Sequence, residues 1–299
     1  MTLVERLSSL QLIVVTGKGG VGKSTLAAAL ALALTGRGRR VLTLEVDPRE
    51  SLYQLFDVDP SGGQIVRVGP GLFIQNLQAR AVLDQVVREQ LRIGFLADRV
   101  LGSPVYQHFA EGAPGLKELA VLGHVMRVLR GLSGSETPRV DTVVLDAPAS
   151  GHILSLLAAP QLVSEVIADG PFGRMARELA ELISDAERCG IVVVTRAEEM
   201  PMQEAIELTG ALERQLGRRP ETILVNALYP VVQADDGATD RDDPMLAVWQ
   251  RRLEVNRREL ERLRRAWSDS LVELPMLPLE RGPELADALG RRLEREEAG

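Results

Sequence analysis

A glycine-rich stretch near the start of the chain constrains its fold more than any other feature of the sequence. Residues 17–24 read GKGGVGKS and satisfy the pattern G-x-x-x-x-G-K-[ST]. An apolar run at 12–15 precedes this stretch, and an alanine- and leucine-rich run at 26–34 follows it. This order predicts a strand, a loop and a helix, in which backbone N–H groups of the loop can surround a phosphate. The sequence therefore predicts a nucleotide-binding α/β domain.

The other apolar runs predict how the rest of this domain is built. Buried strands that alternate with helices are typical of a doubly wound, mostly parallel sheet. We therefore expect an α/β fold of the P-loop NTPase type with about seven or eight strands. Further strands are expected at 41–46, 72–77, 140–145, 190–195, 222–226 and 270–274.

Two stretches depart from the alternation of strands and helices. Residues 79–138 and 158–188 show a helical pattern without a strand, which predicts a helical subdomain inserted into a single domain spanning 1–299. Segment 233–243 is acidic and poor in apolar residues, which predicts a mobile loop. The long charged helix expected after it has apolar residues at helical spacing. That pattern favours a helix packed on its own sheet, with a coiled-coil seam as the alternative.

Composition excludes several classes of protein. The 299 residues carry a net charge of −7, which argues against a nucleic-acid partner. No apolar run reaches the ~18 residues of a membrane span, so no integral membrane segment is expected. Residues 1–10 lack the pattern of a targeting peptide and are expected to lead directly into the first strand. The single cysteine, Cys189, cannot form an intramolecular disulfide and is expected to be a small core residue, which favours a cytoplasmic protein.

Four side chains are placed to hold a nucleotide and its metal ion. In a loop of this kind Lys23 reaches the β- and γ-phosphates, and the Ser24 hydroxyl ligates Mg²⁺. Asp146 follows the apolar strand at 140–145, where its carboxylate can hold the water shell of the ion. Asp47 ends the second strand, at the edge where parallel strands present ligand-binding residues. Taken alone, either aspartate could instead cap a helix.

Lysine is scarce in this chain, and its positions are informative. Three of the 35 basic residues are lysines, and two of them, Lys18 and Lys23, lie in the glycine-rich loop. A compact ammonium group fits a crowded phosphate pocket where a broad guanidinium fork does not. Lys18 marks the deviant Walker A class, so the chain resembles the MinD, ParA, nitrogenase iron protein and ArsA group of dimeric ATPases. The resemblance implies that Lys18 reaches the phosphates bound by a partner chain.

Within that group, the chain resembles the ArsA family over nearly its whole length. This family includes the arsenite-pump ATPase and the ATPase that guides tail-anchored membrane proteins. Residues 47–52 (DPRESL) resemble the first switch of the family, 146–152 (DAPASGH) the second switch, and 114–118 (PGLKE) the start of a family helix. The resemblance implies a dimeric ATPase that uses Mg²⁺ and ATP and handles a client protein through its helical layer.

The resemblance also implies individual roles. Asp47 would orient the attacking water, Asn226 would read adenine, and Glu198, or its neighbour Glu199, would approach the partner's nucleotide. Residues 275–277 would close over the base. The expected site therefore has as catalytic residues Asp47, Lys18 and Lys23; as nucleotide-binding residues Gly17, Lys18, Gly19, Gly20, Val21, Gly22, Lys23, Ser24, Thr25, Glu198, Asn226, Pro275, Met276 and Leu277; and as metal ligands Ser24, Asp146 and Asp47.

Three departures from the family pattern qualify this expectation. Glu50 stands where the first switch has a histidine, which puts family-specific switch contacts in doubt but not hydrolysis. The region before the long charged helix contains no cysteine pair, and the chain has one cysteine, so neither zinc nor arsenite binding is expected. The chain has one phosphate loop, so a homodimer or a heterodimer with a paralogous ATPase is expected.

Three questions of function stay open at this stage. Apolar residues on the helical stretches could form a groove for a hydrophobic client, or simply the core of the subdomain. A MinD- or ParA-like positioning ATPase acting at a membrane or on DNA is the alternative class. Leu285, Leu289 and Leu293 near the end of the chain could contact a membrane, although a fold-closing helix is favoured. The chain could also be the regulatory subunit of a heterodimeric ATPase.

Overall fold

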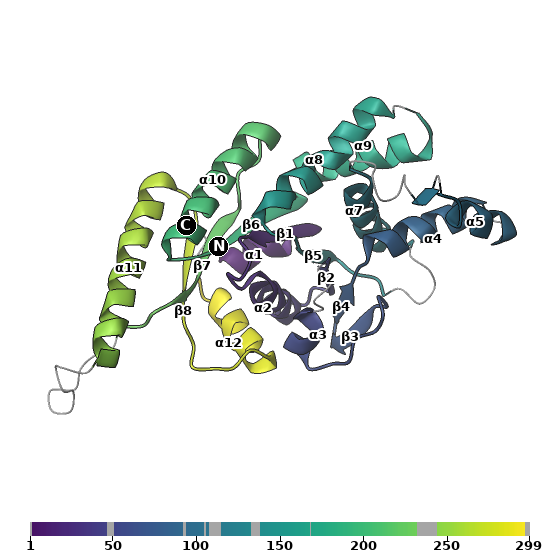
Figure 1. Cartoon of the computed structure of the whole chain (residues 1–299). Helices are drawn as coiled ribbons and strands as arrows, with labels where there is room; N and C mark the ends of the chain where they lie inside the picture. Colours follow the sequence, from purple (N-terminus) through teal and green to yellow (C-terminus); the bar gives the residue numbers. More distant parts are fainter. Residues whose placement is uncertain are drawn as a thin grey trace.

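An eight-stranded sheet forms the centre of the molecule (Figure 1). The computed structural model describes residues 2–46, 51–91, 94–104, 106–107, 115–132, 138–167, 169–231 and 244–296. Within these ranges the strand order is β3-β4-β2-β5-β1-β6-β7-β8, and only β3 runs antiparallel to its neighbour. The expected doubly wound α/β fold is therefore confirmed. The strands are β1 Leu12–Gly17, β2 Val41–Glu45, β3 Val66–Gly69, β4 Leu72–Asn76, β5 Thr142–Asp146, β6 Cys189–Arg196, β7 Thr222–Leu228 and β8 Leu271–Pro275.

Helices cover both faces of this sheet. On one face, α1, α2, α3 and α12 pack against it, and on the other face lie α4 and α7 to α11. The described helices are α1 Leu3–Ser8, α2 Lys23–Gly36, α3 Ser51–Phe56, α4 Ala79–Leu91, α5 Gly94–Leu101, α7 Leu116–Leu129, α8 Ser150–Val166, α9 Gly170–Ser184, α10 Glu199–Leu216, α11 Pro244–Ala266 and α12 Pro283–Leu293.

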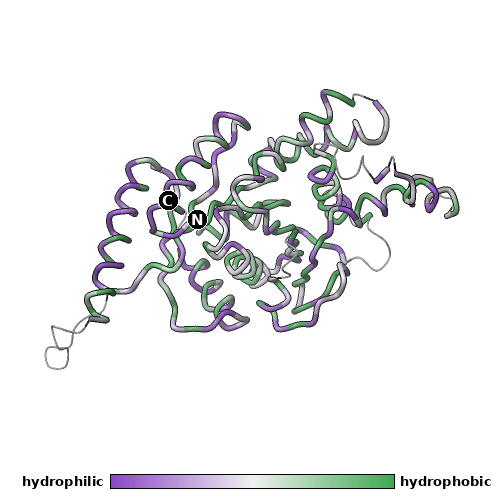
Figure 2. Tube along the Cα trace, in the orientation of Figure 1, coloured by the Kyte–Doolittle hydropathy of each residue, from purple (hydrophilic) through white to green (hydrophobic). Residues whose placement is uncertain are grey.

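The central strand β1 shows how the sequence separates the two faces. Leu12 and Val14 belong to the core beneath α7 to α11, while Ile13 and Val15 belong to the core beneath α1, α2 and α12. Because successive side chains of a strand point to opposite faces, a continuous apolar run is buried on both sides. Figure 2 shows this as green strands in the middle of the molecule and a largely purple α11 at its edge.

Two short elements differ from the expectation. β3 is an eighth strand that pairs with β4 through a tight turn in which Gly71 has a φ of +72°. It lies at the sheet edge and is half-exposed, so it lacks the apolar run that marks the strands at the centre of the sheet. Residues 1–10 do not lead directly into β1, because α1 precedes it. Its capping box, in which Thr2 and Glu5 bond to each other's backbone N–H, is a sequence signal that the expectation overlooked.

Additional helices gather at one end of the molecule, on the right and upper right of Figure 1. There α4 contacts α5 and α7, and α7 contacts α8 and α9. The stretch 158–188, expected to be helical, contains the second part of α8 and all of α9; α8 itself begins at Ser150 and continues through Pro160. The expected acidic loop at 233–243 lies outside the described residues. In the helix that follows it in the sequence, α11, Leu260 and Leu263 are buried in the core of the same chain. This agrees with the favoured interpretation that α11 packs on its own sheet.

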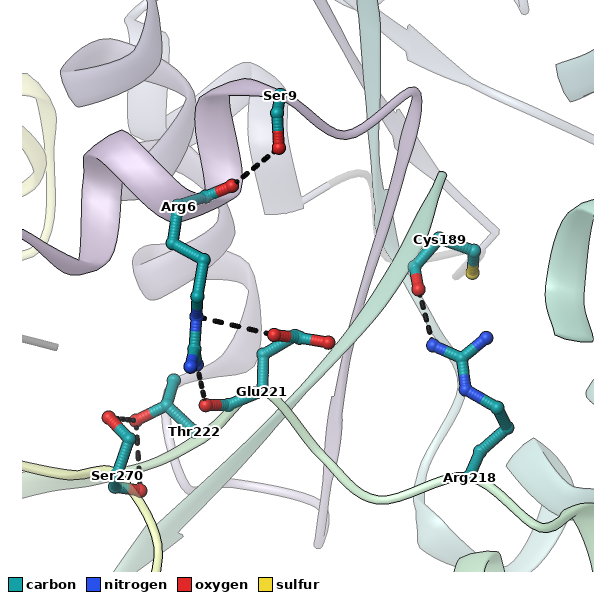
Figure 3. Close-up of polar contacts among 7 residues, drawn as sticks. All are labelled: Arg6, Ser9, Cys189, Arg218, Glu221, Thr222 and Ser270. Atoms are coloured by element: carbon teal, nitrogen blue, oxygen red, sulfur yellow. Dashed lines mark hydrogen bonds and ion pairs between the residues drawn. The ribbon is translucent and has the colours of Figure 1, made fainter. Parts of the chain in front are cut away.

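Polar contacts connect the segments around the amino-terminal ends of β6, β7 and β8 (Figure 3). Arg6 of α1 forms an ion pair with Glu221 (Nε to Oε2, 3.3 Å) and donates to the Glu221 carbonyl, which anchors α1 beside the start of β7. The buried Arg218 guanidinium donates to the carbonyls of Ile183 and Cys189. The Cys189 side chain is completely buried, and burial raises the pKa of its thiol to about 12. The thiol is therefore neutral near pH 7, consistent with a small core residue.

His124 should make the protein less stable in mild acid. It lies buried on α7, its Nε2 is 2.9 Å from Gln75 Oε1, and burial lowers its pKa to about 4. The unfolded chain, with a histidine pKa of about 6.5, then binds more protons than the folded chain between about pH 4 and 6.5. The free energy of unfolding should therefore be highest above about pH 6.5, where His124 is neutral in both states. It should fall by up to a few kcal/mol as the pH drops from about 6.5 to about 4.

Urea unfolding at pH 7.5, 6 and 5 measures this effect. His124→Gln removes the titrating group but keeps an amide donor toward Gln75, so its unfolding free energy should depend less on pH in this window. Equal pH dependence in the wild type and the variant would show that His124 is not responsible.

Candidate functional site

The glycine-rich loop lies between the carboxyl end of β1 and the start of α2, as its pattern predicts. Two glycines of this loop have backbone conformations that disfavour any other residue. Gly17 has a φ of +147°, and a Cβ there would overlap the carbonyl oxygen of Val194 on the neighbouring β6. Gly22 has a φ of +99° and is the N-cap residue of α2. The loop is therefore shaped by backbone conformations that only glycine adopts freely.

The start of α2 has the features of an anion site. Its N-cap residue, Gly22, makes no side-chain hydrogen bond to the helix, and the first turn carries no acidic residue. Positions 19 and 20 are open, because a Cβ on either glycine would meet nothing within 4 Å. The uncapped N–H groups and the helix dipole favour a negative charge here. The residues present therefore fit the phosphates of a nucleotide.

Lys23 and Lys18 have different surroundings. The Lys23 ammonium donates to the Lys18 carbonyl at 3.1 Å, so it lies across the phosphate loop. The Lys18 ammonium instead contacts Glu204 Oε1 of α10 at 2.6 Å, and about a third of the Lys18 side chain is exposed. The same carboxylate accepts a hydrogen bond from the Ser150 hydroxyl at 3.3 Å. Glu204 therefore joins the loop, α10 and the first residue of α8.

Asn226 contacts the phosphate loop directly. Its side-chain amide donates to the Val21 carbonyl at 2.9 Å, and a Cβ on Gly22 would overlap that amide nitrogen. Asn226 therefore braces the loop from β7. The positive φ of Gly22 is what favours glycine at this position, and the Asn226 amide leaves little room for a side chain there. The adenine-reading role of Asn226 stays a prediction.

The strand ends bring the expected metal ligands toward the loop. Asp146 ends β5, is 3% exposed, and lies in register with Val15 of β1 and Glu45 of β2. Ser24 and Thr25 lie in the first turn of α2. Asp47 and Glu50 lie outside the described residues. Among the residues that are described, no group of three or more histidine, cysteine, aspartate or glutamate side chains is arranged to hold a metal ion.

The residues expected around the base lie at the same edge of the sheet. Pro275 ends β8 in register with Leu228 of β7, and the Met276 N–H donates to the Leu228 carbonyl at 2.7 Å. Leu277 packs against the core beneath α2. Pro275, Met276 and Leu277 therefore follow the strand next to Asn226, as a base-covering segment would.

Glu198 is less directly placed than the loop residues. It is the N-cap residue of α10 and forms an ion pair with Arg196 at 3.2 Å, with about a third of its side chain exposed. Glu199 lies in the first turn of α10. The carboxylate on α10 that does contact the loop is Glu204, which sequence reasoning missed. Its partner Lys18 lies 186 residues away, so no local spacing indicates the pair.

Fold and loop together define a P-loop nucleotide hydrolase. Residues 10–170 match the model of the ArsA family, described as anion-transporting ATPases. The chain is 32% identical to ATPase BagA of Mycobacterium tuberculosis, over 79% of this chain and 73% of that protein. It is 29% identical to an arsenical pump-driving ATPase of Escherichia coli, over 80% of this chain and 42% of the pump ATPase. The chain belongs to the ArsA family and is an ATP-hydrolysing enzyme.

Proposed function

We propose that this ATPase is a Mg²⁺-dependent switch that closes as a dimer around two nucleotides. The observation that carries the proposal is the position of Lys18. Its ammonium lies on Glu204 at a partly exposed site, while Lys23 lies across the loop of its own chain. Lys18 is thus available to a second chain that approaches the loop. Mass measurement by light scattering with and without Mg²⁺ and ATP tests the dimer.

The phosphate loop and two strand ends supply the binding groups of this switch. Backbone N–H groups of the loop and Lys23 would hold the phosphates, and Ser24 and Asp146 would hold the ion. When bound, Mg²⁺ neutralises charge on the β- and γ-phosphates. Asp47 orients the attacking water, and Lys18 adds positive charge from the partner chain, where charge develops during transfer.

Glu204 and α8 offer a route from this site to the helical layer. Lys18 and Ser150 share the Glu204 carboxylate, so moving Lys18 to a partner's phosphates removes one of the two contacts at this carboxylate. Ser150 begins α8, whose 17 residues span about 25 Å. We therefore place the conformational response along α8, in line with switches that bias a packed helix.

An apolar pocket lies along α8. It has a volume of about 750 Å³ and is bounded by the start of α7 and by α8 from Leu154 to its end. Two of its lining residues, Leu162 and Val166, are 59% and 84% exposed. Leu154, Ala158 and Leu119 also line it. An exposed apolar pocket on the responding helix supports the handling of a client with an apolar segment.

An acidic side chain in this pocket should weaken client binding without changing basal turnover. Leu162→Asp places a charge where an apolar segment would be buried, and we expect at least ~10-fold weaker binding of a leucine-rich hydrophobic helix peptide. Fluorescence anisotropy of the labelled peptide measures affinity. Val231→Asp is the matched control, because Val231 is a 77% exposed apolar residue outside the pocket. Equal affinity of both variants would argue against a client site here.

The alternative of a membrane-positioning ATPase receives less support. Of the leucines considered for membrane contact, Leu289 and Leu293 are 3% and 0% exposed, and α12 packs against α2. None of the helices in the described ranges has the length and apolar character needed to cross a bilayer. We also propose a cytoplasmic location, supported by the single cysteine, which cannot form an intramolecular disulfide.

A further inference from the structure

A buried carboxylate lies beside the segment that contains Asp47. Glu45 is the last residue of β2, and its exposed fraction is 0%. A carboxylate removed from water destabilises a fold unless hydrogen-bond donors surround it. The hydrogen-bond donors around the Glu45 carboxylate therefore indicate its role in the structure. The first-switch pattern starts at residue 47 and does not include Glu45.

Two of these donors belong to the backbone of α3. Glu45 Oε1 accepts from the Ser51 N–H at 2.8 Å, and Oε2 accepts from the Leu52 N–H at 3.2 Å. The Asn76 side-chain amide on β4 also donates to Oε2, at 3.4 Å. Hydrogen bonds to an ionised acceptor are stronger than neutral ones, and negative charge is favourable at the start of a helix. Glu45 therefore holds the first turn of α3 against the end of β2.

This contact spans the segment that carries the proposed water-orienting residue. Five residues, 46–50, separate Glu45 from Ser51, and Asp47 is one of them. The segment leaves β2 at Glu45 and enters α3 at Ser51, so one side chain fixes the positions of both ends. β2 is itself held in parallel register with β4 and β5, where Glu45 lies opposite Asp146. Both ends of the segment are thereby fixed relative to the expected metal ligand.

We propose that Glu45 is a positioning residue for ATP hydrolysis. It holds the start of α3 against the end of β2, the two described points that the segment with Asp47 connects, and through them it acts on the water that Asp47 is proposed to orient. The inference rests on the proposed function of Asp47. A misplacement of about 1 Å in a reacting group can lower a rate by about 100-fold, so the contact acts on turnover more than on binding.

Glu45→Gln tests this role while preserving the size of the side chain. The neutral amide of glutamine has one acceptor oxygen in place of two. It therefore cannot reproduce both hydrogen bonds that the carboxylate accepts from the Ser51 and Leu52 N–H groups. We expect kcat to fall at least ~10-fold, as is typical when a residue that orients a functional side chain is replaced. The KM for ATP should change less than about threefold. Hydrogen exchange of a peptide covering residues 51 and 52 should become faster.

Two further variants separate positioning from folding. Glu45→Asp keeps the charge but shortens the side chain, so it should give an intermediate kcat and remains informative if the glutamine variant does not fold. Glu273→Gln is the matched control, because Glu273 is also a strand carboxylate, lies on β8 and pairs with Arg264 at the protein surface. Its kcat and the exchange of residues 51 and 52 should equal those of the wild type.

The outcomes distinguish this inference from the function on which it rests. If Asp47→Asn hydrolyses ATP normally, the proposed role of Asp47 fails, whatever Glu45 does. If Asp47→Asn is inactive while folded Glu45→Gln keeps wild-type kcat, only the positioning role is overturned. A loss of kcat that merely follows the fraction of unfolded Glu45→Gln protein, measured by circular dichroism, also overturns it.

Discussion

Replacing Asp47 with asparagine should lower the kcat of ATP hydrolysis at least ~100-fold while leaving ATP affinity within about threefold. The amide has nearly the shape of the carboxylate but lacks the charge that orients and polarises a water molecule. The phosphates are expected to be bound by the loop at 17–24 and the start of α2, so binding should persist. Phosphate release measures turnover, and equilibrium binding of a fluorescent ATP analogue measures affinity.

Asp59→Asn is the control for this variant, since Asp59 is an exposed aspartate after α3. It should hydrolyse ATP at the wild-type rate. Unchanged steady-state hydrolysis by Asp47→Asn would refute the role of Asp47. A loss of ATP affinity as large as the loss of kcat would instead place Asp47 in binding.

Lys18→Arg should impair ATP-driven dimerisation far more than nucleotide binding by the single chain. The arginine keeps the positive charge, but its wide guanidinium group differs in shape and hydration from the ammonium that contacts Glu204. We expect the chain concentration at half-dimerisation to rise at least ~10-fold in Mg²⁺ and ATP. We expect kcat to fall at least ~100-fold, because the guanidinium does not place its charge where the ammonium does.

Light scattering across a concentration series, with and without nucleotide, measures the dimer. Lys117→Arg is the matched control, because Lys117 is the third lysine of the chain and is exposed on α7. It should dimerise as the wild type does. If Lys18→Arg also dimerises normally, or loses affinity for the fluorescent ATP analogue to the same extent, then Lys18 does not act across an interface.

Local patterns in the sequence predict most of this fold. The loop between β1 and α2 is marked by glycines that backbone geometry requires, and the strands at the centre of the sheet are rich in buried apolar residues. β3 has no apolar run because it is half-exposed at the edge. Pro160 predicts a break, since proline usually interrupts a helix, yet α8 continues through it.

The charged contacts around the site are harder to predict from the sequence than the fold is. Glu204 meets Lys18 only because the chain folds back after 186 residues, and no sequence spacing signals that approach. Glu45 is different, since a glutamate within the apolar run at 41–46 is itself a local signal of a buried charge. What the sequence does not show is that its carboxylate bonds to the Ser51 and Leu52 N–H groups.

Mixing two inactive variants tests the central claim, that Lys18 completes the site of a partner chain. Lys18→Ala lacks the lysine but keeps Asp47, and Asp47→Asn has the opposite defect. In a mixed dimer, the site on the Lys18→Ala chain has its own Asp47 and the partner's lysine. At equal amounts, with saturating ATP and chain concentrations well above the dimerisation midpoint, random pairing should restore about a quarter of wild-type hydrolysis. If the mixture is no more active than the separate variants, the lysine does not act across the dimer and the proposed switch is contradicted.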